Sequence, residues 1–225
     1  MRLSTGTSGY SYKAWKGSFY PDDLADGEML SYYASRLPAV EINNTFYRMP
    51  KESELARWAD EVPESFRFAL KVSRRITHFK RLRECEEELR YLLETVQTLG
   101  ERLGALLFQL PPNFARDDER LTDFLDLLPP RCRAAFEFRH DSWFDEAVYD
   151  LLRQHRGATL CIAETDERRW DEIPTTGDWG YLRLRRDDYS RREVEAWAER
   201  IARQPWEEAY AFFKHEDAGE GPRLA

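Results

Sequence analysis

The amino-acid sequence predicts an α/β fold, a TIM-like (β/α)8 barrel that forms one domain over residues 1–225, with a last helix that is short or missing. Three observations predict it. Eight short apolar blocks recur along the chain, about 28 residues apart on average, which is the length of one strand and one helix with short loops. Most gaps between the blocks carry helical patterns, and no linker rich in proline, glycine and serine divides the chain. Alternating strands and helices imply a parallel sheet, and eight of them favour a closed barrel.

The eight blocks are the predicted strands. An open, doubly wound sheet is the competing architecture, but the run GTSG at residues 6–9 does not match the GxGxxG pattern and no Walker loop is present. In chain order the predicted strands are Leu3–Ser8, Ala39–Tyr47, Arg67–Ser73, Ala105–Leu110, Arg133–His140, Ala158–Thr165, Gly180–Arg185 and Glu208–His215.

Four of the gaps have the amphipathic pattern of a helix. In Arg83–Gly100, apolar residues recur at spacings of three and four, acidic residues open the segment, and the final glycine suits its end. The other three predicted helices are Asp117–Leu128, Phe144–Gln154 and Arg191–Ala202. Between the sixth and seventh strands, Asp166–Asp178 contains a proline and a glycine and is predicted to be a loop.

Composition and charge exclude several classes of protein. An apolar fraction of 42% supports a core and excludes disorder. No apolar run approaches the roughly 20 residues that span a bilayer. The 34 Lys and Arg against 42 Asp and Glu give a net charge of −8, which disfavours nucleic-acid binding by the whole surface. The first residues lack a secretion signal, and Cys85, Cys132 and Cys161 form no CxxC pair, so we expect a cytoplasmic protein with reduced thiols.

Side chains alternate along a strand, so the parity of a position separates the barrel interior from the helix-facing side. In the third block, Phe68 and Leu70 face one way and leave Lys71 on the other. Active sites of this architecture lie at the C-terminal mouth of the barrel, where the strand-to-helix loops converge. The alternation places there Glu41, Asn43, Lys71, Gln109, Glu137, Arg139, Arg183 and, on the last strand, Lys214.

These charged residues have two interpretations. They could pair with one another, as Glu41 with Lys71 or Glu137 with Arg139, and form a satisfied polar plug. Buried ion pairs stabilise a fold poorly compared with apolar packing, so a ring of charges also suggests that a polar ligand is bound there.

Five motifs stand in order over the first two thirds of the chain. They are GTSGYSY at residues 6–12 with Trp15, VEINNTFYR at 40–48, KVSR at 71–74 with ITH at 76–78, LFQLPP at 107–112 and EFRHDSW at 137–143. This set resembles the DUF72 family, also called YecE-like proteins, and the similarity is looser from Ala158 onward. The resemblance implies a TIM-like barrel but names no activity. Relatives tend to end the last strand in Asn-rich sequence before a final helix, whereas here Lys214 and His215 are followed by only ten residues.

Two chemistries fit the sequence poorly. A metal site needs three or more converging His or carboxylate ligands, and the chain has only four histidines. Lys71 and Arg139 would also repel a cation from the mouth, so we expect no cofactor, and a metal held by His140, Glu137 and Glu41 is the alternative. A large group of barrel glycosidases carries a pair of carboxyl groups on strands four and seven, where this chain has Gln109 and Arg183. Glu41 and Glu137 are the alternative acid/base pair, on other strands.

Binding of a small phosphate- or carboxylate-bearing ligand fits the mouth better, because lysine and arginine supply fixed donors to such groups. As an enzyme, the protein would be a hydrolase or isomerase in which Glu41 or Glu137 acts as general base and Lys71 is the third catalytic residue. Core packing is the alternative role for the aromatic residues among the candidates. The predicted ligand-binding residues are Tyr10, Trp15, Asn43, Tyr47, Gln109, Arg139, His140, Trp143 and Arg183.

The alternative function is binding of single-stranded or damaged DNA. Basic residues interleaved with aromatic ones hold single strands, and the segment after the third strand surrounds Phe79 with basic residues. A solvated loop balanced by the glutamates that begin at Glu84 is the competing interpretation. The basic residues of this segment are Arg74, Arg75, Lys80, Arg81 and Arg83, and a second cluster contains Arg183, Arg185, Arg186, Arg191 and Arg192.

Overall fold

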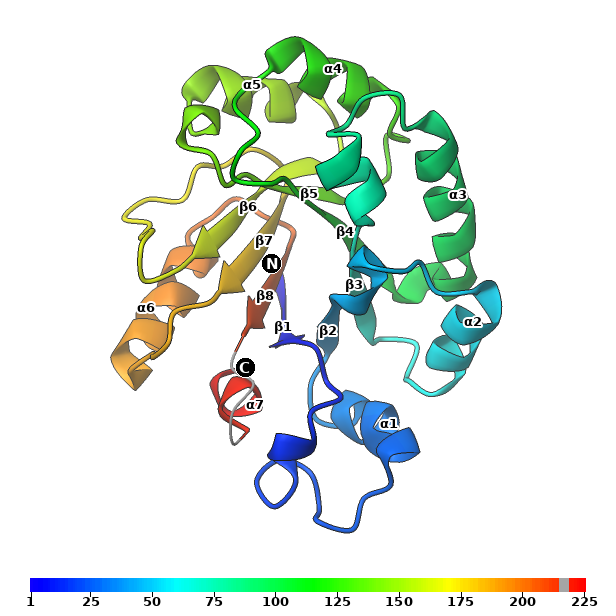
Figure 1. Cartoon of the computed structure of the whole chain (residues 1–225). Helices are drawn as coiled ribbons and strands as arrows, with labels where there is room; N and C mark the ends of the chain where they lie inside the picture. Colours follow the sequence, from blue (N-terminus) through cyan, green and yellow to red (C-terminus); the bar gives the residue numbers. More distant parts are fainter. Residues whose placement is uncertain (215–218) are drawn as a thin grey trace.

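The structure, a computed structural model, describes residues 1–214 and 219–225 and confirms the predicted closed barrel (Figure 1). The parallel strands pair in chain order, and β1 pairs with β8 to close the barrel. The second strand ends at Ile42 rather than at the predicted Tyr47, because the chain turns into a short 3-10 helix, η3. The strands are β1 Arg2–Ser8, β2 Ala39–Ile42, β3 Arg67–Lys71, β4 Leu103–Gln109, β5 Ala134–Glu137, β6 Ala158–Glu164, β7 Trp179–Leu184 and β8 Glu208–Phe213.

The α-helices lie outside the strands (Figure 1). They are α1 Met29–Ala34, α2 Glu52–Asp60, α3 Glu86–Val96, α4 Asp118–Asp126, α5 Glu146–Gln154, α6 Arg191–Ala202 and α7 Glu220–Leu224. The four predicted helices are α3 to α6, and the five-residue α7 confirms the short last helix. Residues 166–178 contain no helix, as predicted. In the described parts of the chain, no helix is long and apolar enough to cross a membrane.

Short helical turns connect several of these elements. Near the barrel mouth, η3 follows β2, and a single π-helical turn, η4, follows β3. The short turns are η1 Lys13–Trp15, η2 Asp26–Glu28, η3 Asn44–Phe46, η4 Arg75–Phe79, η5 Gln97–Arg102 and η6 Asp141–Trp143.

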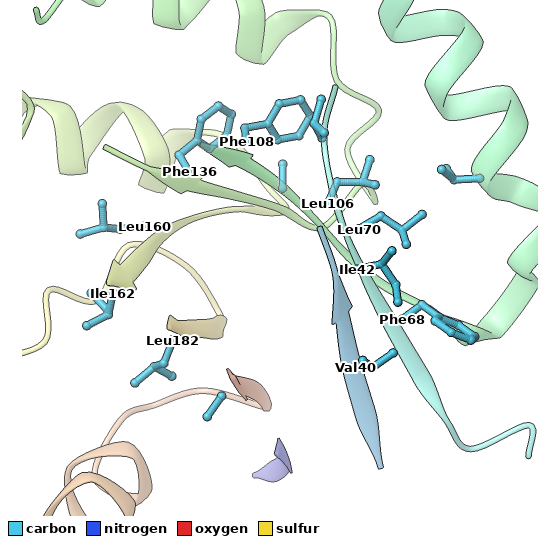
Figure 2. Close-up of a cluster of buried hydrophobic side chains, with 14 of the residues drawn as sticks. Val40, Ile42, Phe68, Leu70, Leu106, Phe108, Phe136, Leu160, Ile162 and Leu182 are labelled. Atoms are coloured by element: carbon cyan, nitrogen blue, oxygen red, sulfur yellow. The ribbon is translucent and has the colours of Figure 1, made fainter. Parts of the chain in front are cut away.

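An outer apolar core separates the strands from the helices, and Figure 2 shows part of it. Alternate residues of each strand point outward into this core, as the parity rule predicts. Phe108 on β4 and Phe136 on β5 stack with ring centroids 5.2 Å apart. The labelled residues of this core are Val40, Ile42, Phe68, Leu70, Leu106, Phe108, Phe136, Leu160, Ile162 and Leu182.

The barrel interior has a second, smaller core that is asymmetric in side-chain size. Four alanines line β2 to β5, and four aromatic residues project from β7 and β8 to fill the space that the alanines leave. Tyr181 and Phe212 lie with ring centroids 5.4 Å apart. Above this core, at the C-terminal ends of the strands, the interior becomes polar. The inner apolar residues are Ala39, Ala69, Ala105, Leu107, Ala135, Cys161, Trp179, Tyr181, Tyr210 and Phe212.

Candidate functional site

Arg183 is the centre of the polar layer at the barrel mouth. It lies on β7 and is only 1% exposed. Its Nη2 donates to Oε1 of Glu41 at 2.8 Å, and its Nη1 donates to Oε2 of Glu137 at 2.5 Å. The two carboxylates come from β2 and β5, so one guanidinium connects three strands across the interior.

Glu41 accepts hydrogen bonds from several donors besides Arg183. The hydroxyls of Ser8 and Tyr181 each donate to it at 2.7 Å, and Nδ2 of Asn43 donates at 3.1 Å. Burial alone would raise the pKa of this carboxyl, but Arg183 and the hydroxyl donors hold the pKa below its ordinary value. Glu41 is therefore ionised at neutral pH, with its oxygens engaged.

Glu137 is held in the same way. Gln109 Nε2 donates to Oε1 at 2.7 Å, and Arg139 Nε lies 3.2 Å from the same oxygen. Burial would raise the pKa of Glu137, but Arg183 and Arg139 outweigh it and lower the pKa to about 2. A carboxylate with so low a pKa is a weak proton acceptor, which argues against the general-base role expected for Glu137.

Two cations at the mouth have no carboxylate partner. Within residues 1–214 and 219–225, neither the Lys71 ammonium nor the Arg185 guanidinium makes a side-chain hydrogen bond or an ion pair. Both side chains are half-buried, and Lys71 Nζ lies 4.2 Å from the centroid of the Phe46 ring. Burial and Arg183 together lower the pKa of Lys71 to about 8, and the same two causes lower the pKa of Arg185.

Glu41, Glu137, Arg139 and Arg183 all lie close enough to Lys71 and Arg185 to shift the pKa of both cations. The carboxylates of Glu41 and Glu137 are therefore near four cations, namely Arg139, Arg183, Lys71 and Arg185. Four cations thus surround two carboxylates, an excess of two positive charges in a chain whose net charge is −8. This local excess favours a bound anion.

A hollow of about 860 Å³ opens beside this cluster, over the ends of β4 to β7. Glu137, Arg139 and Arg185 belong to its lining, so the outer side of the cluster borders this hollow. Two further arginines at its rim are already paired: Arg168 with Asp141, and Arg169 weakly with Glu164 and Asp166. The other lining residues are Pro112, Phe138, Ala163, Thr165 and Glu167.

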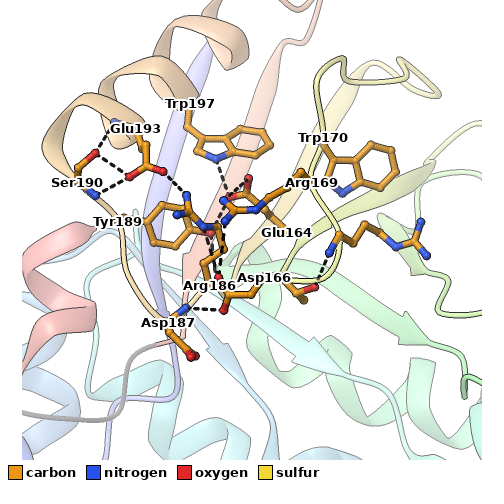
Figure 3. Close-up of polar contacts among 12 residues, drawn as sticks. Glu164, Asp166, Arg169, Trp170, Arg186, Asp187, Tyr189, Ser190, Glu193 and Trp197 are labelled. Atoms are coloured by element: carbon orange, nitrogen blue, oxygen red, sulfur yellow. Dashed lines mark hydrogen bonds and ion pairs between the residues drawn. The ribbon is translucent and has the colours of Figure 1, made fainter.

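A polar network fixes the segment that carries Arg185 (Figure 3). Tyr189 Oη and Trp197 Nε1 donate to the same oxygen of the buried Glu164, at 2.7 Å and 2.9 Å. The guanidinium of Arg186 lies over the ring of Tyr189, 4.9 Å from its centroid. These contacts connect the end of β6, the segment after β7 and α6, so the backbone next to Arg185 is held on both sides.

The structure brings seven of the twelve predicted site residues together in this cluster. Tyr10 is half-buried in a neighbouring hollow of about 540 Å³ that also includes Asn43. Tyr47 is 68% exposed, and His140 caps η6 through its contact with Ser142. The seven residues are Glu41, Asn43, Lys71, Gln109, Glu137, Arg139 and Arg183.

Trp15 and Trp143 do not line the mouth, although they were predicted from the sequence as ligand-binding residues. Both are completely buried in the outer core. The indole of Trp143 stacks on Phe138 with centroids 4.6 Å apart, and its Nε1 donates to the carbonyl of Phe114 at 2.7 Å. Their role is core packing, the alternative that the sequence left open.

The comparison with known proteins agrees with this architecture. The family described as "Protein of unknown function DUF72" matches residues 4–225. The chain belongs to the DUF72 family. A DUF72 family protein from Thermotoga maritima has a solved structure that is similar over the whole chain, with a TM-score of 0.86, 27% sequence identity and 97% of that chain covered. A DUF72 family protein from Enterococcus faecalis has a TM-score of 0.78 at 21% identity over 99% of this chain and 93% of that chain, which supports the fold alone.

Curated relatives of this DUF72 chain match over a shorter stretch. UPF0759 protein YecE of Escherichia coli K12 is 34% identical over 141 residues, which is 60% of this chain and 52% of that protein. UPF0759 protein YunF of Bacillus subtilis is 28% identical over 145 residues, 59% of this chain and 50% of that protein. The chain therefore spans about half the length of the curated relatives it matches. Outside the family, D-psicose 3-epimerase shares the barrel fold at 10% identity, with a TM-score of 0.56 over 98% of this chain and 89% of that one.

The sequence prediction did not include Arg185 or His78 among the ligand-binding residues of the DUF72 mouth, although it named Arg185 in the second basic cluster of the nucleic-acid alternative. Arg185 shares the parity of Arg183, so the alternation that placed Arg183 inside also signals Arg185. His78 lies in the π-helical turn after β3, and the strand alternation that separates inward from outward side chains does not apply there. Burial, Lys71 and Arg139 lower the pKa of His78 to about 4, so its ring is neutral.

Two remaining predictions concern the last strand and metals. Lys214 is exposed and follows β8, whereas His215 lies outside the described residues. Among the residues that the structure describes, no group of three His, Cys, Asp or Glu side chains could hold a metal ion.

Proposed function

We propose that this protein binds a small molecule bearing a phosphate or carboxylate group at the C-terminal mouth of its barrel. The observation that carries the proposal is a pair of half-buried cations, Lys71 and Arg185, that have no carboxylate partner among the residues the structure describes. A partly buried cation without a counter-ion is unfavourable unless another group supplies the negative charge. An anionic ligand supplies it.

The polar-plug interpretation accounts for only part of the cluster. Arg183 with Glu41 and Glu137 is such a plug, since each charge is buried and hydrogen-bonded. Lys71 and Arg185 add positive charge that this arrangement does not need and that destabilises it by repulsion with Arg183. Binding of an anion is the simplest reason for their presence.

In this proposal the two glutamates position the arginines and do not transfer protons. Both carboxylates accept several hydrogen bonds and have lowered pKa values. Hydrolysis or isomerisation with a glutamate as general base therefore loses its support. Lys71, with a pKa of about 8, is the group whose proton is exchangeable near neutral pH.

Calorimetric titration with inorganic phosphate and with acetate, at pH 7 and low ionic strength, tests the proposal. We expect Arg185→Met and Lys71→Met each to weaken the binding of the better anion roughly tenfold or more, the effect of one charge-assisted hydrogen bond. Arg203→Met is the matched control, because Arg203 is 76% exposed at the end of α6 and pairs with the exposed Glu199. Binding that is absent in the wild type, or equal in all four proteins, contradicts the proposal.

A second candidate function rests on a different surface, next to the mouth. The guanidinium of Arg74 lies between two exposed aromatic rings, 5.5 Å from the centroid of Tyr47 and 5.3 Å from that of Phe79. Each ring is 68% exposed. Aromatic faces combined with arginine are a stacking platform for the bases of single-stranded nucleic acid.

The glutamates that follow this surface neutralise only part of it. Glu88 pairs with Arg75 and Lys80. In the described chain, Arg74 and Arg83 have no carboxylate partner. The surface thus keeps the cations that a phosphate backbone requires.

Fluorescence anisotropy with a labelled oligothymidylate tests this candidate. We expect binding at low salt that weakens steeply as salt rises, and a loss of roughly fivefold or more in Phe79→Ala, from one lost base stack. Leu3→Ala is the control, since Leu3 is also exposed but lies near the start of β1, at the end of the barrel away from the mouth. The absence of binding at low salt overturns this candidate.

A further inference from the structure

We propose that Lys71 is an imine-forming lysine, whose Nζ attacks the carbonyl carbon of an aldehyde or ketone that also carries a carboxylate or phosphate group. This inference rests on the proposed anion site and names the substrate class of that site. It assigns to Lys71 a covalent reaction in addition to the binding of an anion.

The position of Lys71 fits a nucleophile. The residue ends β3, so its backbone is fixed by the pairing of β3 with β2 and β4. Its ammonium has no carboxylate partner in the described residues, and the cation–π contact with the Phe46 ring, 4.2 Å away, favours the charged form less than an ion pair would. A lysine in a tight ion pair stays protonated, whereas one in a partly desolvated site without a counter-ion releases its proton readily.

Neighbouring cations strengthen this effect. Arg183 and Arg139 both act against a second positive charge at Lys71, in addition to burial, and the pKa is about 8. Roughly one tenth of the Lys71 side chains are then neutral at pH 7, compared with well under a thousandth for an ordinary lysine. A neutral amine is the form that attacks a carbonyl.

The reaction balances without an oxidant or reductant. The lone pair of Nζ forms a bond to the carbonyl carbon, and the C=O π electrons move to oxygen. One proton passes from nitrogen to that oxygen, a second comes from solvent, and the oxygen leaves as water. The nitrogen keeps one proton and forms a positively charged C=N bond, which draws electrons from the adjacent carbon atom.

The surrounding charges select the substrate. Arg139 and Arg185 line the hollow beside the cluster, where they are available to an anionic group. A compound with its carbonyl close to a carboxylate or phosphate, such as a 2-oxo acid or a sugar phosphate in its open form, joins both requirements in one small molecule. A neutral aldehyde satisfies only one of them.

Reductive trapping tests the inference. The whole chain is incubated with glyoxylate and cyanoborohydride at pH 7, and the modified lysines are identified by peptide mass spectrometry. We expect Lys71 to be modified roughly tenfold or more faster than other lysines, because of its larger neutral fraction. Phosphate should slow the reaction at Lys71, and propanal should react there more slowly than glyoxylate.

Two variants serve as controls. Lys71→Arg keeps the charge but has no nucleophilic amine, so the fast adduct should disappear. Lys51→Arg changes an exposed lysine before α2 and should leave the adduct unchanged. If the wild type binds phosphate but Lys71 is modified no faster than Lys51, the imine inference is wrong and the anion site stands. If neither phosphate nor acetate binds or slows the reaction at Lys71, the proposed function itself fails.

Discussion

Arg183 on β7 and Glu137 on β5 form a fully buried ion pair in which Nη1 lies 2.5 Å from Oε2. The strand between them is β6, so the pair spans the interior rather than joining neighbouring strands. A pair of this kind contributes little net stability compared with apolar residues, but the loss of one partner is strongly destabilising. The loss of one partner should therefore produce a change in the free energy of unfolding that is large enough to measure.

Replacement of Arg183 should expose that asymmetry. Arg183→Met leaves Glu41 and Glu137 buried without their shared cation, and we expect a loss of about 3–5 kcal/mol in the free energy of unfolding. Urea denaturation at pH 7 measures it, and Arg203→Met should change stability little because Arg203 is exposed. If Arg183→Met does not fold, Arg183→Lys can replace it, because lysine keeps the charge but not the forked geometry. Arg183→Lys should still lower the free energy of unfolding more than Arg203→Met does. A loss below about 1 kcal/mol in Arg183→Met would contradict the assigned role.

Glu137 should govern part of the acid sensitivity. Its folded pKa of about 2 lies below the unfolded value, so the stabilisation is complete above the unfolded pKa and is lost as pH falls through the folded pKa. The shift corresponds to about 3 kcal/mol at pH 7. Urea denaturation from pH 6 to pH 2 should show that the difference between wild type and Glu137→Gln shrinks as pH falls. A difference that stays constant over this range would sink the argument.

Lys71 should be a site where function opposes stability. Its folded pKa of about 8 lies below the ordinary value, so the protonated form destabilises the fold below pH 8, and stability rises between about pH 8 and pH 10. We expect Lys71→Met to raise the free energy of unfolding by about 1 kcal/mol at pH 7, after allowance for solvent screening. The gain should shrink at pH 10. A clear loss of stability at pH 7 would favour the polar-plug interpretation.

Trp143 should affect stability without affecting ligand binding. Trp143→Phe removes the hydrogen bond to the Phe114 carbonyl and part of the stacked ring, and we expect a loss of about 1–3 kcal/mol. Denaturation measures the loss, and phosphate titration should give an affinity within twofold of the wild type. A larger change in affinity would return Trp143 to the site.

The sequence predicted the barrel and much of its mouth for one reason. Strands alternate strictly, so Glu41, Gln109, Glu137 and Arg183 could be assigned to the interior before their partners were known. Parity does not say which charges pair. Glu41 pairs with Arg183 rather than with Lys71, and Glu137 pairs with both Arg183 and Arg139.

Aromatic residues and irregular turns could not be assigned in this way. Trp143 and Tyr47 both follow strands, yet one is buried and the other is exposed, because the short turns η6 and η3 orient them differently. Residue type favours burial and ligand contact equally for such rings. His78 was missed for a related reason, since it lies in a π-helical turn rather than in a strand.

The titration of the Lys71 amine is the most direct test of the anion site. Lysines carrying 13C-methyl groups can be followed by NMR across pH, with Lys71→Arg identifying the Lys71 signal. We expect a pKa near 8 in the free protein, and a higher pKa with inorganic phosphate because a bound anion favours the charged amine. A Lys71 signal that titrates like an exposed lysine, or that does not respond to phosphate, would contradict the site proposed at the barrel mouth.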